Sequence, residues 1–195
     1  MVYDKETPED RRAHRIYHDA VINGVPARPL KTERVIWRQE DHRIILVTPL
    51  SPKAERVRAR NLARLANREV HHDGGIYSEN EPPDDRNLHL FLYGVRDRLM
   101  ALTIFELRDH VCRATWEEYD RREPKELEPA PPVWSVGFAW VHPVYRRQGI
   151  ARRLVMEGTR FLNVSLDSVG VYTPFSEEGE KLARALFPTG FLVAK

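Results

Sequence analysis

The sequence is poor in cysteine and in long apolar segments, and each shortage excludes a class of protein. Cys112 is the single cysteine among 195 residues, so no disulfide can form within the chain, which argues against a crosslinked secreted domain. The longest apolar stretches, such as residues 44–47, fall far below the roughly 20 residues that cross a bilayer. The N-terminus is charged where a signal peptide would be apolar. We therefore expect a cytoplasmic protein without a membrane segment.

Lysine is also scarce, with six lysines beside 25 arginines and 29 acidic residues. The formal net charge is only +2, and a nearly balanced surface argues against nucleic acid as a partner. Arginine suits phosphate and carboxylate groups, because its planar guanidinium donates two parallel hydrogen bonds. An arginine bias can equally be a habit of the genome, so composition leaves both explanations open.

The order of apolar, polar and turn-forming residues predicts two parts in the chain. Residues 1–30 are expected to form a helical extension, since Pro8-Glu9-Asp10 is typical of a first helical turn. Residues 31–195 are expected to form one domain. In its first half the patterns predict a hairpin of strands at 34–37 and 43–47, a helix from Pro52 to about Arg68, and a loop at 70–86.

The second half of the chain predicts strands joined by helices. A second hairpin is expected at 88–95 and 99–113, followed by a proline- and glutamate-rich excursion at 117–132. The remaining patterns predict strands at 133–141, 169–172 and 190–194, and helices at 150–162 and 177–187. This order predicts an α/β fold with a mixed, mostly antiparallel central sheet flanked by helices.

The most informative segment is residues 136–154, in which a strand stops before Pro143 and a short loop leads into a helix. Gly149 and Ala151 stand where that helix begins. Unpaired amides at a helix N-terminus bind anions, and small side chains let a phosphate approach closely. Arg146 and Arg147 add positive charge. The segment therefore predicts a phosphate site, although neither a P-loop nor a Gly-x-Gly-x-x-Gly motif occurs in the sequence.

This segment resembles the Arg/Gln-x-x-Gly-x-Gly/Ala loop of the Gcn5-related N-acetyltransferases (GNAT), with Arg146, Gly149 and Ala151 at the motif positions. The resemblance implies that acetyl-CoA is the cosubstrate. It also implies that the strand before the loop splays from its neighbour and offers backbone groups to the pantetheine. The cofactor-binding residues expected on this basis are Ala139, Trp140, Val141, Arg146, Arg147, Gln148, Gly149, Ile150, Ala151 and Ser176.

Over most of residues 33–195, the chain more closely resembles the lysine acetyltransferases that establish sister-chromatid cohesion. The resemblance is carried by residues 33–36, 43–49, 146–154, 179–183 and 191–193, and it is interrupted in the loops at 70–86 and 117–132. Upstream, His14 and His18 resemble the end of that family's small zinc finger. The finger needs two cysteines before the histidines, and none precedes them here. We therefore expect no metal site, and a polar helix face at the two histidines.

At the catalytic positions of the cohesion family, this chain has residues of other chemical types. Its helix carboxylate falls on Met156, its lysine-handling aspartate near Thr173 and its motif-strand serine on Gly137. Many members of the larger superfamily use a tyrosine near the end of the last helix as the general acid. The corresponding residue here is Phe187. The acetyl-CoA half of the family pattern is thus retained, and the lysine-binding half is replaced.

Either other residues supply the acid and the base, or no protein base takes part. Glu157 borders the apolar face of the helix at 150–162, and Glu106 lies in an apolar strand. Partial burial raises the pKa of a carboxyl group and suits it to take a proton through water. We favour Glu157 over Glu106, because Arg108 can hold Glu106 in an ion pair. Tyr172 or Tyr145 can replace the missing acid.

The sequence favours an acetyl-CoA-dependent N-acetyltransferase that transfers acetyl directly to a primary amine, either a protein lysine or a small cationic amine. Direct transfer requires proximity and a deprotonated amine rather than a protein nucleophile. The alternative is a non-catalytic module with the same fold that binds protein or DNA through arginine faces such as Arg56, Arg60 and Arg64. The absent tyrosine and family carboxylates motivate that alternative. The oligomeric state is left open.

Overall fold

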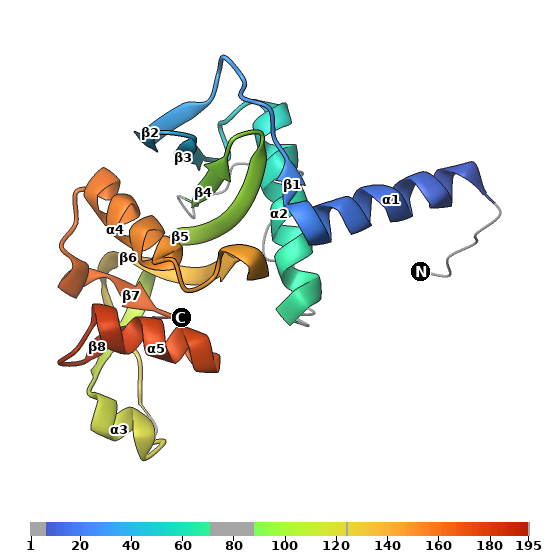
Figure 1. Ribbon diagram of the computed structural model, residues 1–195. Coiled ribbons are helices and arrows are strands. Elements are labelled where there is room, and N and C mark those ends of the chain that lie inside the picture. The colour runs from blue at the N-terminus through green and yellow to red at the C-terminus, as the bar shows by residue number, and fades with distance from the viewer. Residues whose placement is uncertain (1–6, 71–87, 124, 195) are drawn as a thin grey trace.

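The structure is a computed structural model that describes residues 7–70, 88–123 and 125–194. An eight-stranded sheet forms its centre, and helices cover both faces (Figure 1). The sheet has the order β2-β3-β4-β5-β6-β7-β8, with β1 added beside β5. Neighbouring strands are antiparallel except for the parallel pairs β6–β7 and β7–β8. The predicted mixed, mostly antiparallel sheet flanked by helices is therefore confirmed.

Most of the predicted elements are present, with ends that differ by a few residues. The strands are β1 (Val25–Pro26), β2 (Arg34–Gln39), β3 (His42–Val47), β4 (His89–Val95), β5 (Arg98–Ala114), β6 (Glu128–Val141), β7 (Gly170–Val171) and β8 (Phe191–Ala194). The helices are α1 (Pro8–Asn23), α2 (Lys53–Val70), α3 (Trp116–Asp120), α4 (Ile150–Leu162) and α5 (Glu177–Leu186), with short 3₁₀ turns η1 (Pro143–Tyr145) and η2 (Leu166–Ser168).

Side-chain alternation along the strands divides the apolar residues between two cores. On one face of the sheet, Phe91 and Phe105 pack with Leu154 of α4 and Leu186 of α5. On the other face, strand residues pack against α2, whose apolar face includes Leu62. Alternate residues of a strand point to opposite faces, so a strand buried on both sides needs a nearly continuous apolar run. This is why residues 99–105 are apolar apart from Thr103.

The contact between α4 and the sheet depends on Gly158. A Cβ added at this position would lie 2.7 Å from Phe105 Cε2 and 3.3 Å from Phe91 Cε2, and the two rings already pack edge to face. We expect Gly158→Ala to lower the free energy of unfolding by about 1–3 kcal/mol, as overpacking does in tight cores. Urea denaturation of the wild type and the variant measures this difference in the free energy of unfolding. Gly179→Ala is the control, because its Cβ meets chiefly the Ser176 hydroxyl; equal stability of both variants would contradict the prediction.

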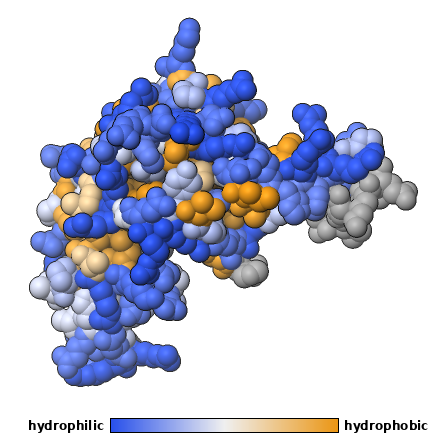
Figure 2. Space-filling model, viewed as in Figure 1, coloured by the Kyte–Doolittle hydropathy of each residue, from blue (hydrophilic) through white to orange (hydrophobic). Residues whose placement is uncertain are grey.

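The N-terminal helix α1 projects from the body (Figures 1 and 2) and is attached to it near its C-terminal end. Arg98 donates to Asp19 at 2.5 Å and to the Gly24 carbonyl at 3.1 Å. The buried His142 ring contacts the Val21 carbonyl oxygen at 2.8 Å through Nε2. The boundary at residues 30 and 31 stays a prediction, and the structure adds that β1 within the extension pairs with β5.

The excursion expected at 117–132 is the main difference from the sequence-based elements. Thr115 and Glu118 form a capping box that starts α3, and β6 begins at Glu128 rather than at 133. Prolines are tolerated in this part of β6, because β7 pairs only with residues further along the strand. The loop expected at 70–86 lies, apart from Val70, outside the described residues. None of the described helices combines the length and apolar character needed to cross a bilayer.

Candidate active site

The central feature of the site is the point where strand β6 leaves its neighbour β7. The two strands pair only at Ser135 and Val136. On the β5 side, Ile104 faces Phe138 and Phe105 faces Val136, so the register skips Gly137 in the manner of a β-bulge. In the described part of the chain, the remainder of β6 beyond this point has no pairing with β7. Its backbone on that side is thus available to a ligand, as the expected splay requires.

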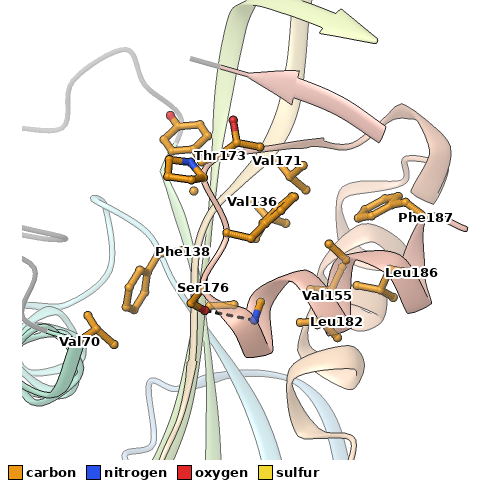
Figure 3. Close-up of a pocket in the computed structure, with 17 residues that line it drawn as sticks. Val70, Val136, Phe138, Val155, Val171, Thr173, Ser176, Leu182, Leu186 and Phe187 are labelled. Carbon is orange, nitrogen blue, oxygen red and sulfur yellow. Dashed lines mark hydrogen bonds between the residues drawn. The ribbon is translucent and has the colours of Figure 1, made fainter. Parts of the chain in front are cut away.

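A cavity of about 590 Å³ opens at this point between the sheet, α4 and α5. Figure 3 shows Val136 and Val171 near its centre, Val155, Leu182 and Leu186 on the helix side, and Phe138 and Val70 on the opposite side. The walls are mostly apolar, and the polar groups are few. Ser176, the N-cap of α5, accepts a hydrogen bond from the Gly179 amide at 3.1 Å. Such a space fits a flexible, largely apolar ligand arm.

The loop between β6 and α4 ends in an open helix N-terminus. Gly149 is the N-cap of α4 with φ of +74°, and a Cβ built there meets no atom within 4 Å. Arg147 also has a positive φ, of +64°. Among the described side chains, none caps the first turn of α4. Its amides and the helix dipole are therefore directed at open space, which makes this helix end suitable for phosphate.

The side chains of the loop point in different directions. Arg146 donates from Nε to the Val141 carbonyl at 2.9 Å and pairs through Nη2 with Glu69. Arg147 pairs with Glu178 on the exposed side. Gln148 donates to the Val144 carbonyl at 3.4 Å. Ile150 is buried in the core below α4, and Ala151 is half-buried. Backbone groups, rather than most of these side chains, are available to an anion.

The three residues expected before the loop also differ in role. Ala139 lines the cavity. Trp140 is buried on the face that packs against α2, and its indole donates to Glu69 at 3.0 Å. Val141 is half-buried, and its carbonyl is the acceptor for Arg146. The sequence analysis did not identify Glu69, since nothing in a helix pattern indicates that its last turn meets a loop 77 residues away.

A polar cluster lies at the bulge, where β5 brings Glu106 beside Gly137. Glu106 is only 9% exposed, and a Cβ at position 137 would lie 2.5 Å from its Oε1. Arg108 donates to Glu106 Oε2 at 2.6 Å and lies 5.2 Å from the centre of the Tyr172 ring. Burial, followed by the neighbouring Glu106 carboxylate, raises the pKa of Tyr172 well above its ordinary value. Gly137 and Tyr172 both line the cavity.

Sequence comparison relates the chain to known acetyltransferases. It is 26% identical to human N-acetyltransferase ESCO2 over 166 residues, which is 80% of this chain and 27% of ESCO2. It is 24% identical to mouse N-acetyltransferase ESCO1 over 169 residues, or 80% of this chain and 20% of ESCO1. The chain thus spans about a quarter of the length of these curated relatives. No protein-family model matches it.

Solved structures share the same arrangement of elements. The acetyltransferase domain of xEco2 bound to a K105–CoA conjugate superposes with a TM-score of 0.65, at 20% identity, over 84% of this chain and 98% of that domain. This chain has the GNAT fold. A second match is an aminoglycoside acetyltransferase from an uncultured soil metagenomic sample in complex with sisomicin, with a TM-score of 0.53, 13% identity, and coverage of 76% of this chain and 89% of that one. The GNAT resemblance and its closer likeness to the cohesion-type enzymes are confirmed.

Within the GNAT fold, the favoured base Glu157 lies apart from the cavity, whereas three of the four family positions, Gly137, Thr173 and Phe187, line it. The side chain of Glu157 is 13% exposed, and both of its oxygens accept from Arg160, at 3.0 and 2.9 Å. Neither Glu157 nor Glu106 is among the described residues that line the cavity, but Glu106 faces Gly137, which is. Met156 is exposed, whereas Phe187 is buried at the cavity wall. The structure therefore places Glu106 and Tyr172 together, and Glu157 elsewhere.

The two histidines of α1 lie at a distance of one helical turn. The rings of His14 and His18 are in edge-to-face contact, with centroids 4.2 Å apart. In the described ranges, no group of three or more histidine, cysteine, aspartate or glutamate side chains has a geometry that could hold a metal ion. Two imidazoles alone leave half of a tetrahedral coordination sphere to other donors.

Proposed function

We propose that the chain is an acetyl-CoA-dependent N-acetyltransferase that transfers acetyl directly to a primary amine. The observation that carries the proposal is the opening of the sheet at Gly137, where β6 loses its partner and a 590 Å³ cavity begins. An uncapped helix N-terminus follows the same strand. An apolar channel beside free backbone groups and a phosphate site suits a cosubstrate with a pantetheine arm and a pyrophosphate.

The residues present fit this cosubstrate. The backbone of Ala139 and Val141 would hold the pantetheine, and the α4 amides around Gly149 would hold the pyrophosphate, with Arg147 able to exchange its exposed partner for phosphate. Ser176 and the apolar walls would complete the channel. Bound acetyl-CoA supplies an activated acetyl group, so the chain itself needs to orient the thioester and manage protons.

Glu106 is the residue best placed to take the proton that the acceptor ammonium must lose. It lies beside the bulge, almost buried, with one oxygen toward Gly137 and the other bound to Arg108. Tyr172 is protonated at neutral pH, and burial followed by Glu106 raises its pKa further above the ordinary value. Its hydroxyl can therefore donate a hydrogen bond to the sulfur as it becomes a thiolate. A backbone amide near Val141 would stabilise the tetrahedral oxyanion.

For the acceptor we propose a primary amine, either a lysine side chain of a protein or a small cationic amine. The relatives support this range: the xEco2 domain was solved with a lysine–CoA conjugate, and the metagenomic enzyme is an aminoglycoside acetyltransferase. Met156, Gly137 and Thr173 stand where the cohesion-type residues are expected, so the acceptor subsite differs in chemistry. A cytoplasmic location remains part of the proposal, because acetyl-CoA and a lone cysteine both suit that compartment.

The proposal is tested by acetyl-CoA binding and turnover. Isothermal calorimetry should detect acetyl-CoA binding at tens of micromolar or below, and free-thiol release should follow on at least one amine in a panel of polyamines, aminoglycosides and lysine peptides. Turnover above the protein-free rate excludes a purely non-catalytic module. Absence of acetyl-CoA binding would refute the proposal, whereas binding without turnover would favour the module, with partners at arginine faces such as Arg56, Arg60 and Arg64.

The small size of residue 137 is expected to matter through Glu106. A Cβ at Gly137 would meet Glu106 Oε1 at 2.5 Å, so Gly137→Ala must displace the carboxylate. We expect kcat to fall about tenfold, a part of what a positioned base contributes, with the Kd for acetyl-CoA changed less than about threefold. In a Glu106→Gln background the same substitution should change kcat less than about twofold. Additive losses in the double variant would show that Gly137 acts independently of Glu106.

A further inference from the structure

The last turn of α2 carries a carboxylate that reaches two separate parts of the site. Glu69 Oε2 accepts the Trp140 indole hydrogen bond at 3.0 Å, and Oε1 pairs with Arg146 Nη2. Trp140 belongs to the splayed strand β6, and Arg146 opens the loop that leads to α4. Both oxygens of one carboxylate are thus engaged, each by a different element. Charge-assisted hydrogen bonds of this kind constrain orientation more strongly than neutral ones.

Arg146 is constrained in turn by three contacts. Its Nε donates to the Val141 carbonyl at 2.9 Å, its Nη2 pairs with Glu69, and its backbone amide bonds the Pro143 carbonyl at 3.2 Å. Nε and Nη2 form one edge of the planar guanidinium, so this whole edge is directed at protein acceptors. The side chain therefore braces the loop against the end of β6 and the end of α2.

We propose that Glu69 is a positioning residue for the cosubstrate loop. It holds Arg146, and through Arg146 it sets the path of residues 146–149, which determines where the α4 amides point. The next residue, Val70, lines the cavity. The end of α2 therefore forms part of the cavity wall and also holds the loop in place. The inference rests on the proposed function, because it assigns this loop to the pyrophosphate of acetyl-CoA.

The sign of the effect separates positioning from simple electrostatics. Removing a negative charge near a phosphate site should strengthen anion binding if Glu69 acts only as a charge or as a competitor for Arg146. If Glu69 positions the loop, its loss should weaken binding. Glu69→Gln keeps the size of the side chain and an acceptor for Trp140, but it removes the ion pair with Arg146. Glu178→Gln is the matched control, since it removes the same charge from Arg147 at an exposed pair.

Isothermal calorimetry with acetyl-CoA on the full chain is the deciding experiment. We expect Glu69→Gln to raise the Kd about tenfold, the equivalent of one charge-assisted hydrogen bond, with kcat at saturating acetyl-CoA within about twofold. Glu178→Gln should leave the Kd within about twofold or lower it. In an Arg146→Gln background, Glu69→Gln should have less than about a twofold further effect, because the coupling passes through Arg146.

A second measurement follows the hydrogen bond between Trp140 and Glu69 directly. The indole N–H resonance of Trp140, assigned by its loss in Trp140→Phe, should shift in Glu69→Gln and not in Glu178→Gln. If Glu69→Gln folds poorly, Glu69→Asp, which keeps the charge and shortens the reach, should raise the Kd in the same direction. Wild-type chain that fails to bind acetyl-CoA would refute the proposed function and this inference together. Wild-type binding with equal or tighter binding by Glu69→Gln would overturn the inference alone.

Discussion

Glu106→Gln is expected to lower kcat about a hundredfold or more while leaving the Kd for acetyl-CoA within about threefold. A positioned base typically contributes a factor of this size, and glutamine keeps the volume of Glu106 and its capacity to accept from Arg108 while removing the proton-accepting charge. Initial rates with the best amine of the panel, measured from pH 6 to 9, test this.

Glu157→Gln is the matched control for this experiment. The sequence favours Glu157 as the base, but the structure pairs both of its oxygens with Arg160, whereas Glu106 faces Gly137 at the cavity wall. We expect Glu157→Gln to retain a rate within about threefold of the wild type over the same pH range. A hundredfold loss in Glu157→Gln with an unaffected Glu106→Gln would return the assignment to the helix residue.

Gly149→Glu is expected to abolish acetyl-CoA binding, with a Kd raised at least about a hundredfold. A glutamate here would extend into the open space in front of the α4 amides, where its charge would repel the pyrophosphate and its bulk would occupy the site. Gly149 also has φ of +74°, so any other residue adds backbone strain of roughly 1 kcal/mol. Calorimetry at high protein concentration measures the loss.

Gly149→Ala separates the strain from the blockage. Alanine carries the same backbone strain, without the charge and with little bulk, so we expect its Kd to rise less than about tenfold. The melting temperatures of both variants should differ from each other by less than about 3 °C, because a Cβ at position 149 meets no neighbour. Similar Kd values for the alanine and glutamate variants would show that conformation, rather than exclusion of phosphate, controls binding.

Much of the fold could be predicted because its elements are encoded locally. The apolar runs of β4 and β5, the Arg96-Asp97 turn and the stop at Pro143 are each visible within a few residues. The prediction was poorest at residues 117–132, where glutamates and prolines indicate a loop. There a capping box forms α3 and the sheet edge accepts prolines in β6. Both outcomes depend on which neighbours the segment meets, and local composition does not specify them.

The loop before α4 was predictable for the same reason, since Arg146, Gly149 and Ala151 lie within six residues, after a strand that stops before Pro143 and at the start of a helical pattern. The cluster of Glu106 and Tyr172 was not predictable in this way. Glu106 and Tyr172 are 66 positions apart and meet because β5 pairs with β6, while β7 ends beside the bulge at Gly137. Helical periodicity placed Glu157 at the border of the buried face, but not the direction of the cavity.

The sequence by itself determined the class of fold, most of the helix and strand order and the position of the loop before α4, because these follow from local periodicity, turn residues and spacing. Tertiary structure decided which charged side chains lie together. The strand register places Glu106 against Gly137, and the docking of α2 brings Glu69 to Arg146. Glu157 is instead held in an ion pair with Arg160. The physical reason is that long-range pairing, and not the residue's own neighbourhood in sequence, determines the burial and charge partners on which acid–base chemistry depends.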